Sequence, residues 1–110
     1  MTKTEESGAA QAQPKAYFLI EIAIHSPEIY KNYPIAVEPL IKRYGGRYLV
    51  RGGEAVSIEG AEPGGRIIVL EFPSLKAAQD FANCPEYPAV ARHRLESSTS
   101  RIMLVEGYLP

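Results

Sequence analysis

Two glutamates stand inside short apolar stretches of this chain, where a carboxylate is unusual. Glu21 lies within residues 16–24 and Glu71 within residues 66–72, and both stretches are rich in the β-branched and aromatic residues that indicate strands. If these strands are neighbours in a sheet, we expect the two carboxylates to lie close together, and one of them then keeps its proton to a higher pH. Such a group can act as a general acid or base, which makes Glu71 a candidate catalytic residue.

The same glutamates have a structural alternative. Arg47, Arg51 or Arg101 can neutralise them as ion pairs, because buried charges are normally paired and ion pairs shift pKa values without catalysing anything. Glu106, in the last apolar stretch, admits both interpretations. We favour ion pairing over a catalytic carboxylate.

His25 is the second candidate catalytic residue. It follows the first predicted strand and precedes a helix start at Ser26, in a loop position where proteins often present catalytic groups. An imidazole titrates near neutral pH and suits proton transfer, although a solvated turn residue explains the same placement. His25, His93 and Cys84 lack the spacing of metal ligands, so we expect no metal site and no cofactor.

Two arginines are candidate ligand-binding residues. Arg94 falls on the apolar face of a predicted helix, seven residues after Tyr87, and Arg51 precedes a pair of glycines. A guanidinium in such a place requires a carboxylate of the protein or an anionic ligand. Tyr33 and Tyr87 are the tyrosines that we expect beside a ligand pocket.

The size and charge of the chain limit the class of protein. Its 110 residues fit one domain, and 12 basic against 13 acidic side chains exclude the positive surface that non-specific nucleic-acid binding needs. Residues 1–15 are small or polar and predict a flexible tail without a signal peptide, which leaves residues 16–110 as the domain. No apolar run approaches the roughly 20 residues of a membrane span, so we expect a cytoplasmic protein with no membrane partner.

The remaining pattern predicts the order β-α-β-β-α-β. A first helix is expected from Ser26, its N-cap, to Tyr44, with a kink near Tyr33 because Pro34 and Pro39 each remove a backbone donor. The other elements are predicted at residues 47–51 continuing through 54–58 after a bend, 66–72, 75–82, 87–94 and 101–108. This order is typical of an α+β, ferredoxin-like sandwich, in which a four-stranded antiparallel sheet carries two helices on one face.

The second face of that sheet is predicted to be uncovered. Tyr17, Leu19 and Ala23 share it with Ile67 and Val69, which makes it too apolar to remain in water. We therefore expect a homodimer in which two sheets pack face to face.

Three motifs in order resemble the family named domain of unknown function thirteen-thirty, within the dimeric α/β-barrel superfamily. They span residues 44–53, 70–74 and 85–87 and are followed by Arg94. The resemblance implies a ferredoxin-like homodimer with a cleft for a small molecule, but no general activity. Relatives in the superfamily include cofactor-free monooxygenases, lactone isomerases and haem-dependent dismutases, and a shared fold does not choose among them.

Three hypotheses for the function follow. In the first, a homodimer binds a small organic anion through Arg51 or Arg94 and catalyses cofactor-independent proton transfer or isomerisation, with Glu71 or His25 as the base. In the second, the same arginines hold an effector in a non-enzymatic binding or regulatory dimer. In the third, the pairs of glutamate and arginine only specify the dimer.

Overall fold

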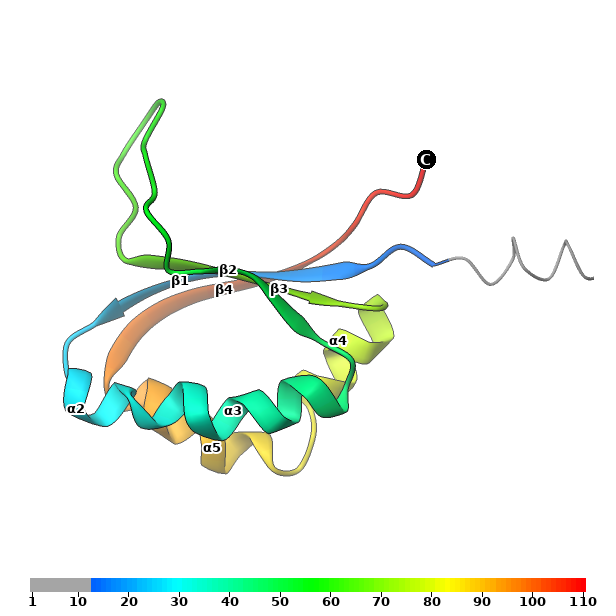
Figure 1. Cartoon of the computed structure of the whole chain (residues 1–110), viewed down its shortest axis with the longest axis horizontal. Helices are drawn as coiled ribbons and strands as arrows, with labels where there is room; N and C mark the ends of the chain where they lie inside the picture. Colours follow the sequence, from blue (N-terminus) through cyan, green and yellow to red (C-terminus); the bar gives the residue numbers. More distant parts are fainter. Residues whose placement is uncertain (1–12) are drawn as a thin grey trace, which may run out of the picture.

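Strand β1 (Ala16–Ile24) lies in the middle of a four-stranded antiparallel sheet in the computed structural model, which describes residues 13–110 (Figure 1). It pairs on one side with β3 (Arg66–Phe72) and on the other with β4 (Ser98–Glu106), while β2 (Arg47–Arg51) forms the edge beyond β3. Four helices cover one face of this sheet (Figure 1). The predicted α+β, ferredoxin-like architecture is confirmed. Most of residues 1–15, predicted to be a tail, lie outside the described residues.

The first helical segment is broken rather than kinked. It consists of α2 (Pro27–Tyr30) and α3 (Asn32–Arg43), separated at Lys31, two residues before the expected kink. Pro34 explains the break, because its nitrogen has no hydrogen to donate to the carbonyl of Tyr30. Ser26 does precede α2, but its hydroxyl makes no capping hydrogen bond, contrary to our expectation of an N-cap side chain.

The second helical segment consists of α4 (Leu75–Ala82) and α5 (Tyr87–Leu95). The hydroxyl of Ser74 accepts a hydrogen bond of 3.1 Å from the backbone N–H of Ala77 and caps α4. None of the helices in the described part of the chain is long and apolar enough to cross a membrane.

The segment between β2 and β3 differs from the prediction. Residues 54–58 form no strand; they belong to an arm that leaves the sheet on the side opposite the helices (green in Figure 1). The backbone N–H of Gly52 still donates to the carbonyl of Ile67 in β3 at 2.8 Å, and its φ of 75° then turns the chain out of β2. The irregularity in the pairing of β2 with β3 lies before Gly52, between Tyr48 and Val50.

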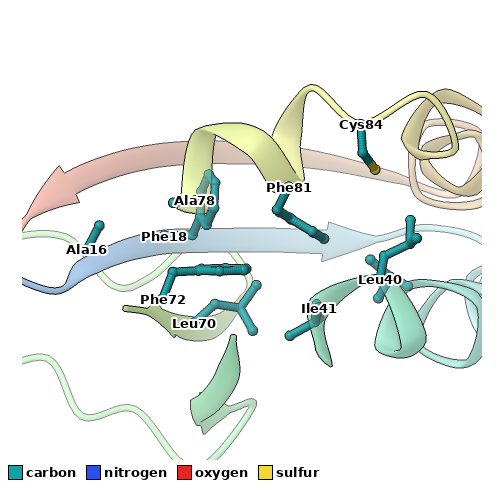
Figure 2. Close-up of a cluster of buried hydrophobic side chains, with 10 residues drawn as sticks. Ala16, Phe18, Leu40, Ile41, Leu70, Phe72, Ala78, Phe81 and Cys84 are labelled. Carbon is teal, nitrogen blue, oxygen red and sulfur yellow. The ribbon is translucent and has the colours of Figure 1, made fainter. Parts of the chain in front are cut away.

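A cluster of buried apolar side chains that includes three phenylalanine rings packs between the sheet and the helices (Figure 2). Phe18 and Phe72 meet edge to face with centroids 5.7 Å apart, and Phe81 of α4 lies 5.0 Å from Phe72. Phe72 is fully buried, whereas Leu19, which points to the other face of β1, is 40% exposed. The alternation predicted for β1 and β3 is therefore present, and within residues 13–110 one face of the sheet has no cover.

The pairing of the strands sets two rows of side chains on the helix-covered face. In the first row, Ile22 of β1 lies between Ser100 of β4 and Arg66 of β3. The second row runs across all four strands, in the order Ile102, Ile20, Ile68 and Arg51. These two rows place arginines at the side of the sheet formed by β2 and β3.

Candidate ligand-binding cavity

A cavity of about 230 Å³ lies between the covered face of the sheet and the helices. Apolar side chains of β1 and β3 form its floor, and α2, α3 and α5 contribute Tyr30, Tyr33 and Tyr87. Within residues 13–110, Arg94 is the one charged residue of the lining. A concave apolar site with a few polar groups is the usual form of a small-molecule site.

Arg94 is buried, with 8% of its surface exposed, and makes few contacts with polar partners. Its Nη1 donates a hydrogen bond of 2.8 Å to the hydroxyl of Ser100, and its Nη2 lies 3.4 Å from the hydroxyl of Tyr87. The Nε atom is buried and has no hydrogen-bond partner among the described residues. No carboxylate of residues 13–110 lies within 4.0 Å of this guanidinium. A buried arginine is normally paired, so this one has unused capacity to bind an anion.

Two tyrosines complete the polar part of the cavity. The hydroxyl oxygens of Tyr33 and Tyr87 are 2.9 Å apart, and the guanidinium carbon of Arg94 lies 5.7 Å from the centroid of the Tyr33 ring. Burial raises the pKa of Tyr33 far above its ordinary value, and the neighbouring Tyr87 raises it further, against the positive charge of Arg94. Tyr33 is therefore a hydrogen-bond donor at neutral pH.

Arg94 also keeps its positive charge. Burial lowers the pKa of its guanidinium, but the hydroxyls of Tyr87 and Tyr33 outweigh this effect and the net pKa is raised. Tyr87 and Arg94 are seven residues apart on α5, which is two helical turns, so both side chains face the cavity. The hydroxyl of Ser98 donates a 2.6 Å hydrogen bond to the carbonyl of Arg94 and fixes the end of the helix.

Glu71 lies on the other, uncovered face of the sheet. Its carboxylate accepts hydrogen bonds from Nε of Arg47, at 2.8 Å, and from the hydroxyl of Tyr17, at 3.1 Å. The hydrogen bond from Arg47 is the main cause that lowers the pKa of Glu71, with burial opposing it and Tyr17 reinforcing it. This direction is opposite to the rise that we expected for one of a pair of close carboxylates.

The expected proximity of Glu21 and Glu71 is wrong. Glu71 is opposite Tyr17 and Glu21 is opposite Ile67, so the two carboxylates are four positions apart along the ladder, about 13 Å. Glu21 has its own partner, because Nη1 of Arg101 lies 3.4 Å from its Oε1. The alternative interpretation, ion pairing by arginine, is what the structure contains for both residues.

The other candidates divide between the edge of the cavity and the solvent. The guanidinium carbon of Arg51 stacks 4.4 Å above the ring of Tyr48, which lines the cavity. His25 is exposed, its backbone N–H donates to the carbonyl of Ser97 at 2.9 Å, and its side chain is not part of the lining. The structure thus brings together Arg94, Tyr33 and Tyr87, with Arg51 nearby, but not Glu71 or His25.

Some residues at the site were not predicted from the sequence. Ser100 was missed because β4 begins at Ser98, three residues before the predicted start, so its position on the covered face was not considered. Tyr30 and Tyr48 also line the cavity, and their positions among apolar residues of α2 and β2 were the available signal. Within residues 13–110, no group of three or more histidine, cysteine or acidic side chains is arranged to hold a metal ion.

This fold and cavity define a small ferredoxin-like α+β protein with a partly open, mainly apolar site. The chain matches the family described as "Domain of unknown function (DUF1330)" over residues 15–108, and it therefore belongs to that family. The resemblance noted in the sequence is confirmed. No curated protein matches the chain.

Two solved proteins share the fold. A protein of unknown function from Rhodopseudomonas palustris, RPA0582, is 20% identical with a TM-score of 0.73 over 100% of this chain and 96% of its own. A structure of methylated RPA0582 gives the same TM-score and identity. SnoaB, a cofactor-independent oxygenase from Streptomyces nogalater, is 12% identical with a TM-score of 0.60, over 88% of this chain and 96% of its own. At these identities the similarity concerns the fold alone.

Proposed function

We propose that this protein binds a small, largely apolar organic anion in the cavity beneath the sheet, with Arg94 as the anion-binding residue. One observation carries the proposal: a buried guanidinium with no carboxylate partner among residues 13–110, whose Nε atom makes no hydrogen bond. A buried donor left without a partner costs about 1–3 kcal/mol, and more when it is charged. A carboxylate or enolate that accepts from this guanidinium removes that cost.

The surroundings of Arg94 favour an anion with an apolar body. Ile20, Ile22 and Ile68 form the floor, where a ligand ring or chain gains about 25 cal/mol for each Å² of apolar surface removed from water. The cavity of about 230 Å³ limits the ligand to a small molecule. Tyr87 and Tyr33 supply hydroxyl donors beside the guanidinium, and charge-assisted hydrogen bonds of this kind are the strong ones.

The experiment is a calorimetric titration with a panel of small apolar anions, such as benzoate, phenylacetate and hexanoate. We expect wild type to bind members of the panel and Arg94→Met to lose roughly 10- to 100-fold in affinity, as for a hydrogen bond to a charged group. Arg92→Met is the matched control, because Arg92 lies on the exposed side of the same helix and pairs with Glu96. Equal affinities in wild type and Arg94→Met contradict the proposal.

Catalysis of proton transfer or isomerisation is the second candidate function. The pair formed by Tyr33 and Tyr87 supports it, because two donors beside a guanidinium can stabilise an enolate oxygen. Glu71 and His25 are the bases expected from the sequence, but neither lines the cavity, and this favours binding over catalysis. Turnover of a panel of enols and lactones by wild type, lost in Tyr87→Phe and kept in Arg92→Met, would establish the enzyme; no turnover leaves a binding protein.

We also propose that two copies pack through the uncovered face of the sheet. An apolar band there includes Leu19, Met103 and Val105, which are 40%, 57% and 43% exposed. Along the sheet, the ion pair of Glu21 with Arg101 lies on one side of Leu19, and the ion pair of Glu71 with Arg47 lies on the other. The arm and the C-terminal segment both rise on this side of the sheet (Figure 1), where they would flank a second copy. Location in the cytoplasm stays a prediction from the sequence.

A further inference from the structure

The arginines of this protein fall into two groups. Four of the seven make ion pairs with glutamates, namely Arg43, Arg47, Arg92 and Arg101. For the other three, no carboxylate of residues 13–110 lies within 4.0 Å, and these are Arg51, Arg66 and Arg94. Arg94 lines the cavity, whereas Arg51 and Arg66 are exposed and lie outside its lining, at the β2–β3 side of the covered face.

The register of the strands places Arg94 and Arg66 on opposite sides of the same apolar floor. Ser100, which holds the guanidinium of Arg94, pairs with Ile22, and Ile22 pairs with Arg66. Side chains that pair in this way project from the same face of the sheet. Ser100 and Arg66 are thus two strand spacings apart, about 10 Å, with Ile22 between them.

Arg51 joins Arg66 on the far side. It pairs with Ile68, which lies on the same face of β3 as Arg66 and lines the cavity. Nη2 of Arg66 lies 3.5 Å from the carbonyl oxygen of Arg51, and the Arg66 guanidinium packs against Gly52, where a Cβ atom would collide with it. The glycine thus gives the Arg66 side chain room beside Arg51.

The tyrosines of the lining lie within reach of these charges. Burial raises the pKa of Tyr30 most, while the positive charges of Arg66, Arg94 and Arg51 each lower it. Tyr48 shows the same pattern, with burial raising its pKa and Arg51 and Arg66 lowering it. Glu38 of α3 is a carboxylate on this side that raises the pKa of Tyr48, but it makes no ion pair within 4.0 Å with either arginine.

From this arrangement we infer that the ligand of the cavity is a dianion: an apolar skeleton with one anionic group bound by Arg94 and a second bound by Arg51 and Arg66. The inference rests on the proposed function and specifies the class of its ligand. A monoanion of the same size would fill the apolar floor and satisfy Arg94, but it would leave the other two guanidiniums in water. An α,ω-dicarboxylate places a charge at both sides and its methylene groups over Ile20 and Ile22.

The test is a titration with pairs of ligands that differ only in the second carboxylate: hexanoate against adipate, and octanoate against suberate. In wild type we expect one dicarboxylate to bind at least about tenfold more tightly than its monocarboxylate, which corresponds to 1.4 kcal/mol. In the double variant Arg51→Gln/Arg66→Gln, the two should bind equally, with the affinity for the monocarboxylate within about twofold of wild type. Both arginines are exposed, so the variant is expected to fold.

Arg101→Gln is the matched control, because it also removes a positive charge from the sheet but on the uncovered face. The preference for the dicarboxylate should remain in this variant. Equal binding of both ligands to wild type, or a preference that persists in the double variant, overturns the inference and leaves the proposed function standing. If wild type binds neither the mono- nor the dicarboxylates, the proposed function fails and the inference fails with it.

Discussion

The hydroxyl oxygens of Tyr33 and Tyr87 lie 2.9 Å apart, which joins the first turn of α3 to the first turn of α5 across 54 residues of sequence. The contact places both hydroxyls beside Arg94, and it depends on both helices being seated on the sheet. The position of both hydroxyls beside Arg94 therefore depends on how the two helical segments pack on the sheet.

The two hydroxyls are expected to contribute to stability as a unit. Tyr87→Phe leaves the half-buried hydroxyl of Tyr33 without its partner, and should lower the free energy of unfolding by about 1–2 kcal/mol. Tyr33→Phe should cost less, because the hydroxyl of Tyr87 still accepts from Nη2 of Arg94, and the double variant should cost less than the sum of the two single losses. Urea unfolding of the four proteins measures this coupling. Additive losses would show that the two hydroxyls act independently.

Glu71 should make stability depend on pH. Its folded pKa is lowered, chiefly by the hydrogen bond from Arg47, so its contribution is present above the unfolded pKa, which is about 4.3, and is lost as pH falls through the folded pKa. Glu71→Gln should reduce the free energy of unfolding at neutral pH by about 1 kcal/mol. Below pH about 4.3, the variant should lose less of this free energy than wild type as the pH falls. Urea unfolding at a series of pH values is the measurement, with Glu28→Gln, an exposed pair with Lys31, as the control. Parallel profiles for wild type and Glu71→Gln would refute the linkage.

If two copies pack through their uncovered sheet faces, a charge introduced into that face should dissociate the dimer. Light scattering of wild type should give twice the 12.1 kDa of one chain, and Leu19→Glu should give the single-chain mass, because it buries an unpaired carboxylate in the interface. Ile35→Glu is the control, since Ile35 is 74% exposed on α3, away from the uncovered sheet face. A stable monomer of wild type at micromolar concentration would exclude the dimer.

The alternation of apolar and polar residues was enough to predict the topology and the face of each side chain in β1 and β3. It was not enough to predict position along a strand: Glu21 and Glu71 share a face, but the register separates them by four positions. Residues 54–58 carry apolar side chains suited to a strand, yet they extend beyond any partner strand, so no ladder forms. Pairing is a non-local property, and composition alone does not encode it.

The residues that the helices contribute to the site were easier to predict from the sequence. Arg94 and Tyr87 share a face because seven residues make two turns, and this spacing holds whatever lies opposite the helix. Ser100 reaches Arg94 only through strand pairing, which sets it opposite Ile22 on the covered face. The positions of the helical residues therefore follow from local spacing, whereas the position of Ser100 follows only from the register of the sheet.

The buried guanidinium should reduce the stability of the free protein. Arg94→Met removes a charge with an unpartnered Nε and replaces it with an apolar side chain of similar length, so the free energy of unfolding without ligand should rise by about 1 kcal/mol or more. Arg92→Met, at an exposed ion pair on the same helix, should change it by less than about 0.5 kcal/mol.

Thermal unfolding with and without the best-binding anion then separates stability from function. The unfolding temperature of wild type should rise with ligand concentration. Arg94→Met should unfold at a higher temperature than wild type without ligand, and its unfolding temperature should rise little when ligand is added. A variant that is less stable than wild type, yet still gains as much from the ligand, would assign Arg94 a structural role instead. Replacements that improve stability and abolish binding are the expected signature of a residue retained for its ligand rather than for the fold.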